Sequence, residues 1–237
     1  MVAALLVLSL GACVHTGEAG RAVGNFDPKQ IAKGDIDRVA DAHRRAVFDS
    51  VRVIAEKLYR RNPREWKKGG HASVEAALDY VLDPRLGWRL PELASYAGRP
   101  PTDQILAALR EDYAGDRVAA FMAGLGAMLN AAFDNKNEFF VYDDLDPQRL
   151  YNSARNIEIA MWKLANARDA AGNLLLLSNE TAIPPKVPNL SFEREFGKLI
   201  GNLDLLARII ADKGNRTIAR VAQSVASAVF LPVAALR

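Results

Sequence analysis

The 237-residue chain contains one cysteine and three histidines, and this shortage excludes several kinds of chemistry. A single cysteine forms no intramolecular disulfide, C-x-x-C redox centre or multi-cysteine zinc site. The sequence also lacks the G-x-S-x-G, H-E-x-x-H, P-loop, G-x-G-x-x-G and EF-hand patterns, which disfavours the enzymes and nucleotide-binding proteins that use them. We therefore expect no cofactor and no metal centre.

The charge is also too sparse for a nucleic-acid partner. The net charge is +3, far from the dense Lys/Arg surface that phosphate-backbone binding needs. Half of the residues are apolar and a quarter are charged, which is ordinary for a folded globular chain. The length favours one domain.

The cysteine ends an apolar run at the start of the sequence, "MVAALLVLSLGAC". Val2 to Leu10 match the length of a signal-peptide core and are too few to span a bilayer, although no Lys or Arg precedes them. Leu10-Gly11-Ala12-Cys13 resembles the lipobox of bacterial lipoproteins. This resemblance covers the first 13 residues only, and it leaves the family of the folded domain open.

The resemblance implies cleavage before Cys13 and attachment of acyl chains to that residue, so that the membrane is a partner through lipidated Cys13. Several acyl chains anchor a protein stably where one is marginal. It also implies a cell-envelope location, on the outer membrane facing the periplasm, because Val14 rather than Asp follows the cysteine. The alternative is an ordinary apolar segment in which Cys13 is a small buried side chain.

Three regions follow from this interpretation: residues 1–12 as signal peptide, 13–34 as lipidated cysteine and flexible tether, and 35–237 as a helical periplasmic domain. Four glycines and an Asp27-Pro28 turn signal indicate the tether. A flexible coil of about 20 residues reaches roughly 25 Å.

The periodicity of the third region predicts an all-α fold, a single bundle of six or seven helices. Apolar or seam residues recur at four-three spacing after Asp35, and shorter helices are expected at 73–82 and from 102. Asp146-Pro147 is a typical helix start. Amphipathic patterns also predict helices over 192–214 and 216–231.

A run of sixteen uncharged residues, Val118 to Phe133, carries small residues every fourth position. Such ridges allow close helix packing. The run is short for a bilayer, so we interpret it as the central helix of the bundle, with membrane insertion as the alternative.

Two apolar segments, "FFVY" (139–142) and "LLLL" (174–177), flank the helix that begins at Pro147. They are expected either to pair as a small two-stranded β ribbon or to cover the ends of the bundle as loops. Four polar residues on that helix are predicted to bind the backbone of these segments, or else to line a ligand cleft. They are Asn152, Arg155, Asn156 and Glu158.

Candidate site residues are few. His71 follows Gly69-Gly70 and is a weak candidate for an acid or base. Asp143, Asp144 and Asp146 are weak candidates for cation ligands, although acids also favour helix starts. A basic and aromatic group is a candidate for contact with anionic lipid, or else a solvated helix end. This group, here called the basic patch, consists of Arg60, Arg61, Arg64, Trp66, Lys67 and Lys68.

These observations favour an anchored envelope lipoprotein whose helical domain binds a protein partner or supports assembly in the periplasm, more readily a binding protein than an enzyme. One alternative is a lipid-anchored hydrolase of cell-wall or lipid material that uses His71 with the acids at 143–146. Another is a periplasmic inhibitor or immunity protein.

Overall fold

A computed structural model describes residues 32–180, 188–220 and 228–233 of the chain. Within these ranges the fold is all-α, as predicted: seven α-helices, one 3₁₀ helix and no sheet. The helices are α1 (Asp35–Arg61), α2 (Pro63–Lys68), α3 (Val74–Val81), η2 (Pro91–Tyr96), α4 (Thr102–Ala108), α5 (Arg117–Ala132), α6 (Pro147–Asn166) and α7 (Ser191–Gly214).

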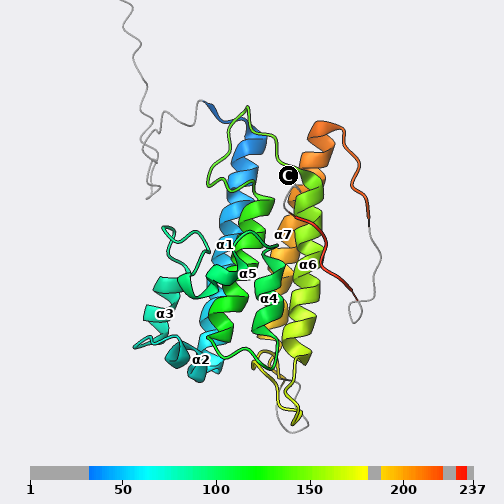
Figure 1. Cartoon of the computed structure of the whole chain (residues 1–237). Helices are drawn as coiled ribbons and strands as arrows, with labels where there is room; N and C mark the ends of the chain where they lie inside the picture. The colour runs from blue at the N-terminus through cyan, green and yellow to red at the C-terminus, as the bar shows by residue number, and fades with distance from the viewer. Residues whose placement is uncertain (1–31, 181–187, 221–227, 234–237) are drawn as a thin grey trace, which may run out of the picture.

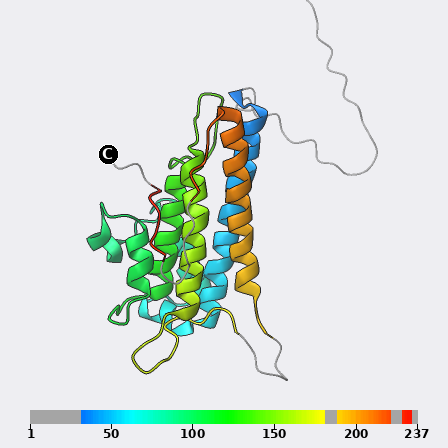
Figure 2. The same ribbon diagram turned by 90° about the vertical axis from the view of Figure 1, so that its right-hand side faces the viewer.

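The four long helices α1, α5, α6 and α7 run side by side, as two perpendicular views show (Figures 1 and 2). α6 packs along α7, α7 along α1, and the short α4 along α5. We call the end of the bundle that holds Asp35 and Gly214 the upper end, and the end that holds Arg61 and α2 the lower end. Apolar side chains from Ala40 to Val233 form one contiguous core between these helices.

Side-chain caps fix where several helices begin. The Ser73 hydroxyl accepts a hydrogen bond from the Ala76 N–H at 3.1 Å, and the Asp116 carboxylate accepts one from the Ala119 N–H at 2.9 Å. The Asp146 carboxylate accepts one from the Gln148 N–H, with Pro147 at the first helical position. Each oxygen satisfies an amide that has no partner inside its helix, so the predicted starts of α3 and α6 are confirmed.

The uncharged run at 118–133 forms most of α5, the central helix. Most of its side chains are buried, which supports the core interpretation. Among the described residues, no helix combines the length and the apolar character that crossing a bilayer requires.

The predicted ribbon is wrong, because its two segments lie at opposite ends of the bundle. At the upper end, Phe139 is buried and its N–H donates to Asp41 of α1. At the lower end, Asn62 binds the backbone N–H and C=O of Leu177, next to the buried Leu176. The alternative, apolar loops that cover the two ends, is therefore the correct one.

The predicted helix over 216–231 is also wrong where the structure can be compared. Residues 216–220 and 228–233 are not helical, and 221–227 fall outside the described ranges. The last described residues instead lie over α6 (red in Figures 1 and 2), and their backbone is bound by side chains of that helix.

The signal-peptide region and Cys13 lie outside the described residues, as does most of the predicted tether. At the far end of that tether, Lys33 is buried and forms an ion pair with Asp41. Residues 33 and 34 therefore belong to the folded body.

Candidate functional site

A cleft of about 760 Å³ opens on the side of the bundle between the 85–101 segment and helices α4 and α5. One wall comes from the chain between α3 and α4, including η2. The floor comes from Gln104 of α4 and from Ala127, Asn130 and Ala131 of α5. A concave site of this size is in the usual range for small-molecule binding.

Trp88 forms the junction between the wall and the core. Its ring stacks on Phe48 of α1 with centroids 5.9 Å apart, and its backbone has a φ of 70°, a conformation that costs energy for a bulky residue. Gly126 of α5 makes room for the ring, because a Cβ there would lie 2.2 Å from it. The close packing of Trp88 on α5 thus holds the wall in place.

The charge in the wall is positive. Arg85, Arg89 and Arg99 line the cleft, and no Asp or Glu does. Arg85 is partly neutralised by Asp83, whose hydrogen bonds raise the pKa of the guanidinium. The Arg99 guanidinium lies 5.6 Å from the centroid of the Tyr96 ring. Arg89 and Arg99 form no ion pair within the described ranges, so their charge is available to a ligand.

The rest of the wall combines apolar surface with a few amides. Leu86, Trp88 and Leu93 supply apolar area beside the arginines. Gln104 Oε1 is buried and accepts no hydrogen bond from the part of the chain that the structure describes. An acceptor in this position favours a ligand that carries a hydroxyl or amide donor.

No His, Cys, Ser, Thr, Asp or Glu is among the lining residues of this cleft, which leaves its wall without the usual nucleophiles and bases. Guanidinium groups beside apolar surface are instead suited to an anion with an apolar body.

His71 lies elsewhere, near the lower end. Its ring packs against Tyr80 with centroids 5.0 Å apart, and the Tyr80 hydroxyl donates to Glu92 at 2.7 Å. His71 Nε2 and Asp116 Oδ2 flank Gly69, since a Cβ on that glycine would lie 3.1 Å from each. The structure therefore brings His71 close to Asp116, a neighbour that no sequence pattern indicated.

Asp116 already has structural roles. It caps α5 and accepts a hydrogen bond from the buried Tyr59 hydroxyl at 2.9 Å. Burial raises the pKa of the Asp116 carboxyl, and burial together with Asp116 raises the pKa of Tyr59. The acids at 143–146 do not reach this region, because α1 is 27 residues long, about 40 Å at 1.5 Å per residue, and they lie at its other end.

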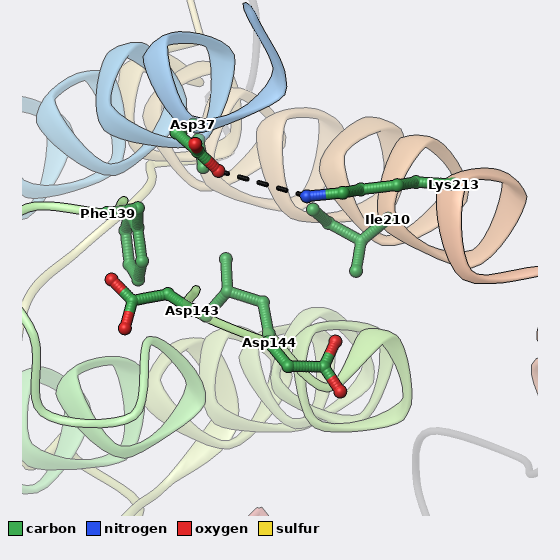
Figure 3. A pocket seen from close by; sticks show the side chains of 8 residues that line it. Asp37, Phe139, Asp143, Asp144, Ile210 and Lys213 are labelled. Carbon is green, nitrogen blue, oxygen red and sulfur yellow. Dashed lines mark ion pairs between the residues drawn. The ribbon is translucent and has the colours of Figure 1, made fainter. Parts of the chain in front are cut away.

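The three predicted metal ligands at the upper end each have another partner. Asp143 pairs with Lys136 at 2.6 Å, Asp144 pairs with Arg216 at 2.5 Å, and Asp146 caps α6. Asp143 and Asp144 border a cavity of about 10 Å³ beside the Asp37–Lys213 ion pair (Figure 3). Such a space holds at most one water. Among the described residues, no cluster of three metal-ligating side chains occurs.

The basic patch lies at the lower end, and much of it is paired. Arg60 contacts Glu56 at 2.8 Å and Glu75 at 3.6 Å, and Lys68 contacts Glu65 at 2.9 Å. Arg61 contacts Glu180 at 3.4 Å, and the Lys67 ammonium lies 5.3 Å from the centroid of the Trp66 ring. Arg64 is exposed. These acidic partners reduce the positive potential that the patch presents.

Sequence reasoning missed the arginine-lined cleft. The stretch "PRLGWRLPELASYAGRP" places three arginines, a tryptophan and a tyrosine in one Gly- and Pro-rich connection between helices, and this was the available signal. Comparisons with family models, with curated proteins and with solved structures found no match to this chain.

Proposed function

We propose that this chain is an envelope lipoprotein, anchored through Cys13, whose helical domain binds an anionic amphiphile in the arginine-lined cleft. The cleft is the observation that carries the binding function, because it combines about 760 Å³ of space with three arginines and no acidic lining residue. An anionic headgroup would contact Arg89 and Arg99, and the apolar part would lie against Leu86, Trp88 and Leu93.

The direction of the bundle is compatible with this proposal. Ala32, the first described residue, lies at the upper end, where its C=O accepts a hydrogen bond from the Val141 N–H at 3.2 Å. An anchor at Cys13 would therefore attach to the upper end. Trp88 stacks on Phe48, 13 residues along α1 and about 20 Å from Asp35, so the cleft lies nearer to the anchor than the basic patch does.

The basic patch has a different place in this proposal. It lies about 40 Å from the upper end along α1, beyond the roughly 25 Å that the tether expected from the sequence would reach. In an upright bundle the patch would face away from the anchoring membrane, toward a protein partner in the periplasm. Contact between the patch and the same membrane would need the bundle to lie on its side.

Replacing Cys13 by serine is expected to abolish lipidation and to release the protein from the membrane fraction. The thiol is the proposed attachment point, and a serine hydroxyl is not acylated in its place. Intact mass and membrane fractionation, on protein expressed from its native locus with any upstream in-frame sequence, measure both effects. Val14→Ala is the matched control and keeps the anchor. Equal membrane retention of Cys13→Ser would contradict the anchor.

Reversing two cleft charges, Arg89→Glu with Arg99→Glu, is expected to weaken binding of dodecyl phosphate about 10- to 100-fold. Hydrogen bonds to charged groups contribute about 1.5 to 3 kcal/mol, and the exposed guanidinium groups fall at the low end. Calorimetry measures the affinity.

The control variant carries the same charge change elsewhere, Arg52→Glu with Arg194→Glu, both exposed residues on α1 and α7. It should bind dodecyl phosphate as the unmodified chain does. Dodecyl maltoside has the same alkyl chain without the charge and is expected to bind at least tenfold more weakly. Equal affinity for the two amphiphiles would refute an anion site.

A further inference from the structure

Three amides on α6 form a ladder along one line of the helix. Gln148, Asn152 and Asn156 are spaced four residues apart and therefore lie above one another on the same face. Asn156 and Asn152 are buried. We call these three side chains the amide ladder.

The amide ladder binds the backbone of the C-terminal segment. Asn156 donates to the Leu231 C=O at 2.7 Å and accepts from the Leu231 N–H at 2.6 Å. Gln148 makes the same pair of bonds with Ala219, at 3.0 and 2.8 Å. Two bonds to one residue imitate the pairing of a β-strand edge, so the amides recognise an extended backbone whatever its side chain.

Asn152 is matched to a proline. It donates to the Pro232 C=O at 2.7 Å, and its own oxygen accepts from Gln148 Nε2 at 2.9 Å. Proline has no N–H to offer, and the neighbouring glutamine supplies the missing donor. The side-chain oxygen and nitrogen atoms of Asn152 and Gln148 thus all have partners with a proline at that position.

Buried apolar side chains also hold the same segment against the bundle. Ala228 and Val233 are 7% and 6% exposed, whereas Val229 is 71% exposed. Phe230 packs partly against the core. Within 228–233 the specificity therefore rests on two small apolar positions at the ends, a proline at the fifth position and backbone bonds between them.

We propose that this face of α6 is a receptor for an extended, apolar, proline-containing segment of a partner protein, and that residues 228–233 occupy it in cis. The C-terminal segment has no regular structure in the described residues and is held by side chains rather than by a helix or sheet ladder. Such segments open at a lower free-energy cost than the helices of the core. This site lies on α6 and is separate from the arginine-lined cleft.

The test cuts the covalent connection between the C-terminal segment and the rest of the folded protein, so that the segment becomes a separate ligand. A protease recognition sequence is inserted between Arg220 and Val221 of the full chain, and the folded protein is then cleaved. The fragment that begins at Val221 is expected to remain bound and to exchange with a fluorescent synthetic peptide of residues 221–237, followed by anisotropy. The uncleaved chain should take up the peptide at least tenfold more weakly, because its own segment competes at high effective concentration.

Variants distinguish recognition of the peptide backbone from nonspecific hydrophobic binding. A peptide with Leu231→Pro lacks the N–H that Asn156 accepts, and it should bind about tenfold more weakly or worse, with the protein itself unchanged. In the protein, Asn156→Leu should have a similar effect. Asn166→Leu is the matched control, since among the described residues the Asn166 amide donates only to the Trp162 C=O of its own helix. Circular dichroism confirms that each variant is folded.

Two results would overturn the proposal. In the first, the fragment leaves after cleavage and no labelled peptide binds, which would mean that the segment is held only by its covalent connection. In the second, the Leu231→Pro peptide binds as tightly as the native sequence, which would mean that the amide ladder does not read the backbone.

Discussion

Replacing Gly124 by alanine is expected to lower the free energy of unfolding by about 2 to 3 kcal/mol. A Cβ at this position of α5 would lie 2.7 Å from the Pro101 C=O oxygen and 2.9 Å from the Ile105 N. Both are backbone atoms of α4 or of the residue before it, so no side-chain rotation relieves the overlap. The whole helix α4 would have to move away from α5.

The matched control is Gly201→Ala on α7. An added Cβ there meets nothing within 4 Å, so only the backbone effect remains. Alanine in an exposed helical position stabilises by about 0.5 to 1 kcal/mol relative to glycine. Chemical denaturation should therefore show opposite signs for the same substitution. Equal effects at the two positions would show that α4 does not pack against α5 as described.

The Gly124 variant also bears on the cleft. Pro101 and Gln104 line it, and both belong to the segment that an alanine at 124 would displace. Dodecyl phosphate should therefore bind the Gly124→Ala variant more weakly, even under conditions in which it remains folded. The Gly201→Ala control leaves the cleft untouched.

Local patterns in the sequence were sufficient to predict the four long helices α1, α5, α6 and α7, whereas the short α2 and η2 were not predicted. The four-three spacing after Asp35 reports the buried face of α1, where Val47, Val51 and Ile54 are all buried. Asp146-Pro147 marks the start of α6 because a cap oxygen and a fixed proline φ act within a few residues. Such signals need no information from distant parts of the chain.

The two wrong predictions depend on partners far away in the sequence. "FFVY" and "LLLL" have strand-like composition, but Asp41 and Asn62 hold them at opposite ends of the bundle. The segment after Arg216 has a helical apolar pattern, yet in its described residues the amides of α6 bind its backbone N–H and C=O groups. A pattern of side chains does not reveal that a distant helix has taken the hydrogen bonds.

The polar residues of α6 were predicted to bind the backbone of "FFVY" and "LLLL", and this prediction was wrong about the segment that is bound. Asn152 and Asn156 do bind backbone, but that of the C-terminal segment. Arg155 contacts Asp204 of α7 at 2.7 Å and Glu158 at 2.9 Å, and thereby joins two helices. The arginine-lined cleft could not be predicted for the same reason, because its wall and the α5 part of its floor come from segments about 40 residues apart.

Arg117 is the other position at which a single substitution should have a large effect. Its side chain is buried at the start of α5, and its guanidinium donates to three backbone oxygens between α4 and α5. The acceptors are the C=O groups of Ala108 at 2.7 Å, Arg110 at 2.5 Å and Glu111 at 3.0 Å. One planar side chain thus satisfies the free carbonyls at the end of α4 and in the following turn.

Replacing Arg117 by lysine keeps the charge and removes this geometry. An ammonium group on a shorter, flexible stem does not span the three carbonyls together, so at least one buried oxygen and part of the charge lose their partners. We expect the free energy of unfolding to fall by about 3 kcal/mol, as for a buried charge that loses a partner. Arg194→Lys, an exposed residue on α7, is the control and should change stability by less than about 0.5 kcal/mol. Equal denaturation midpoints for the two variants would mean that a positive charge at position 117 is sufficient to stabilise the turn between α4 and α5. The hydrogen bonds of the planar guanidinium would then not be required.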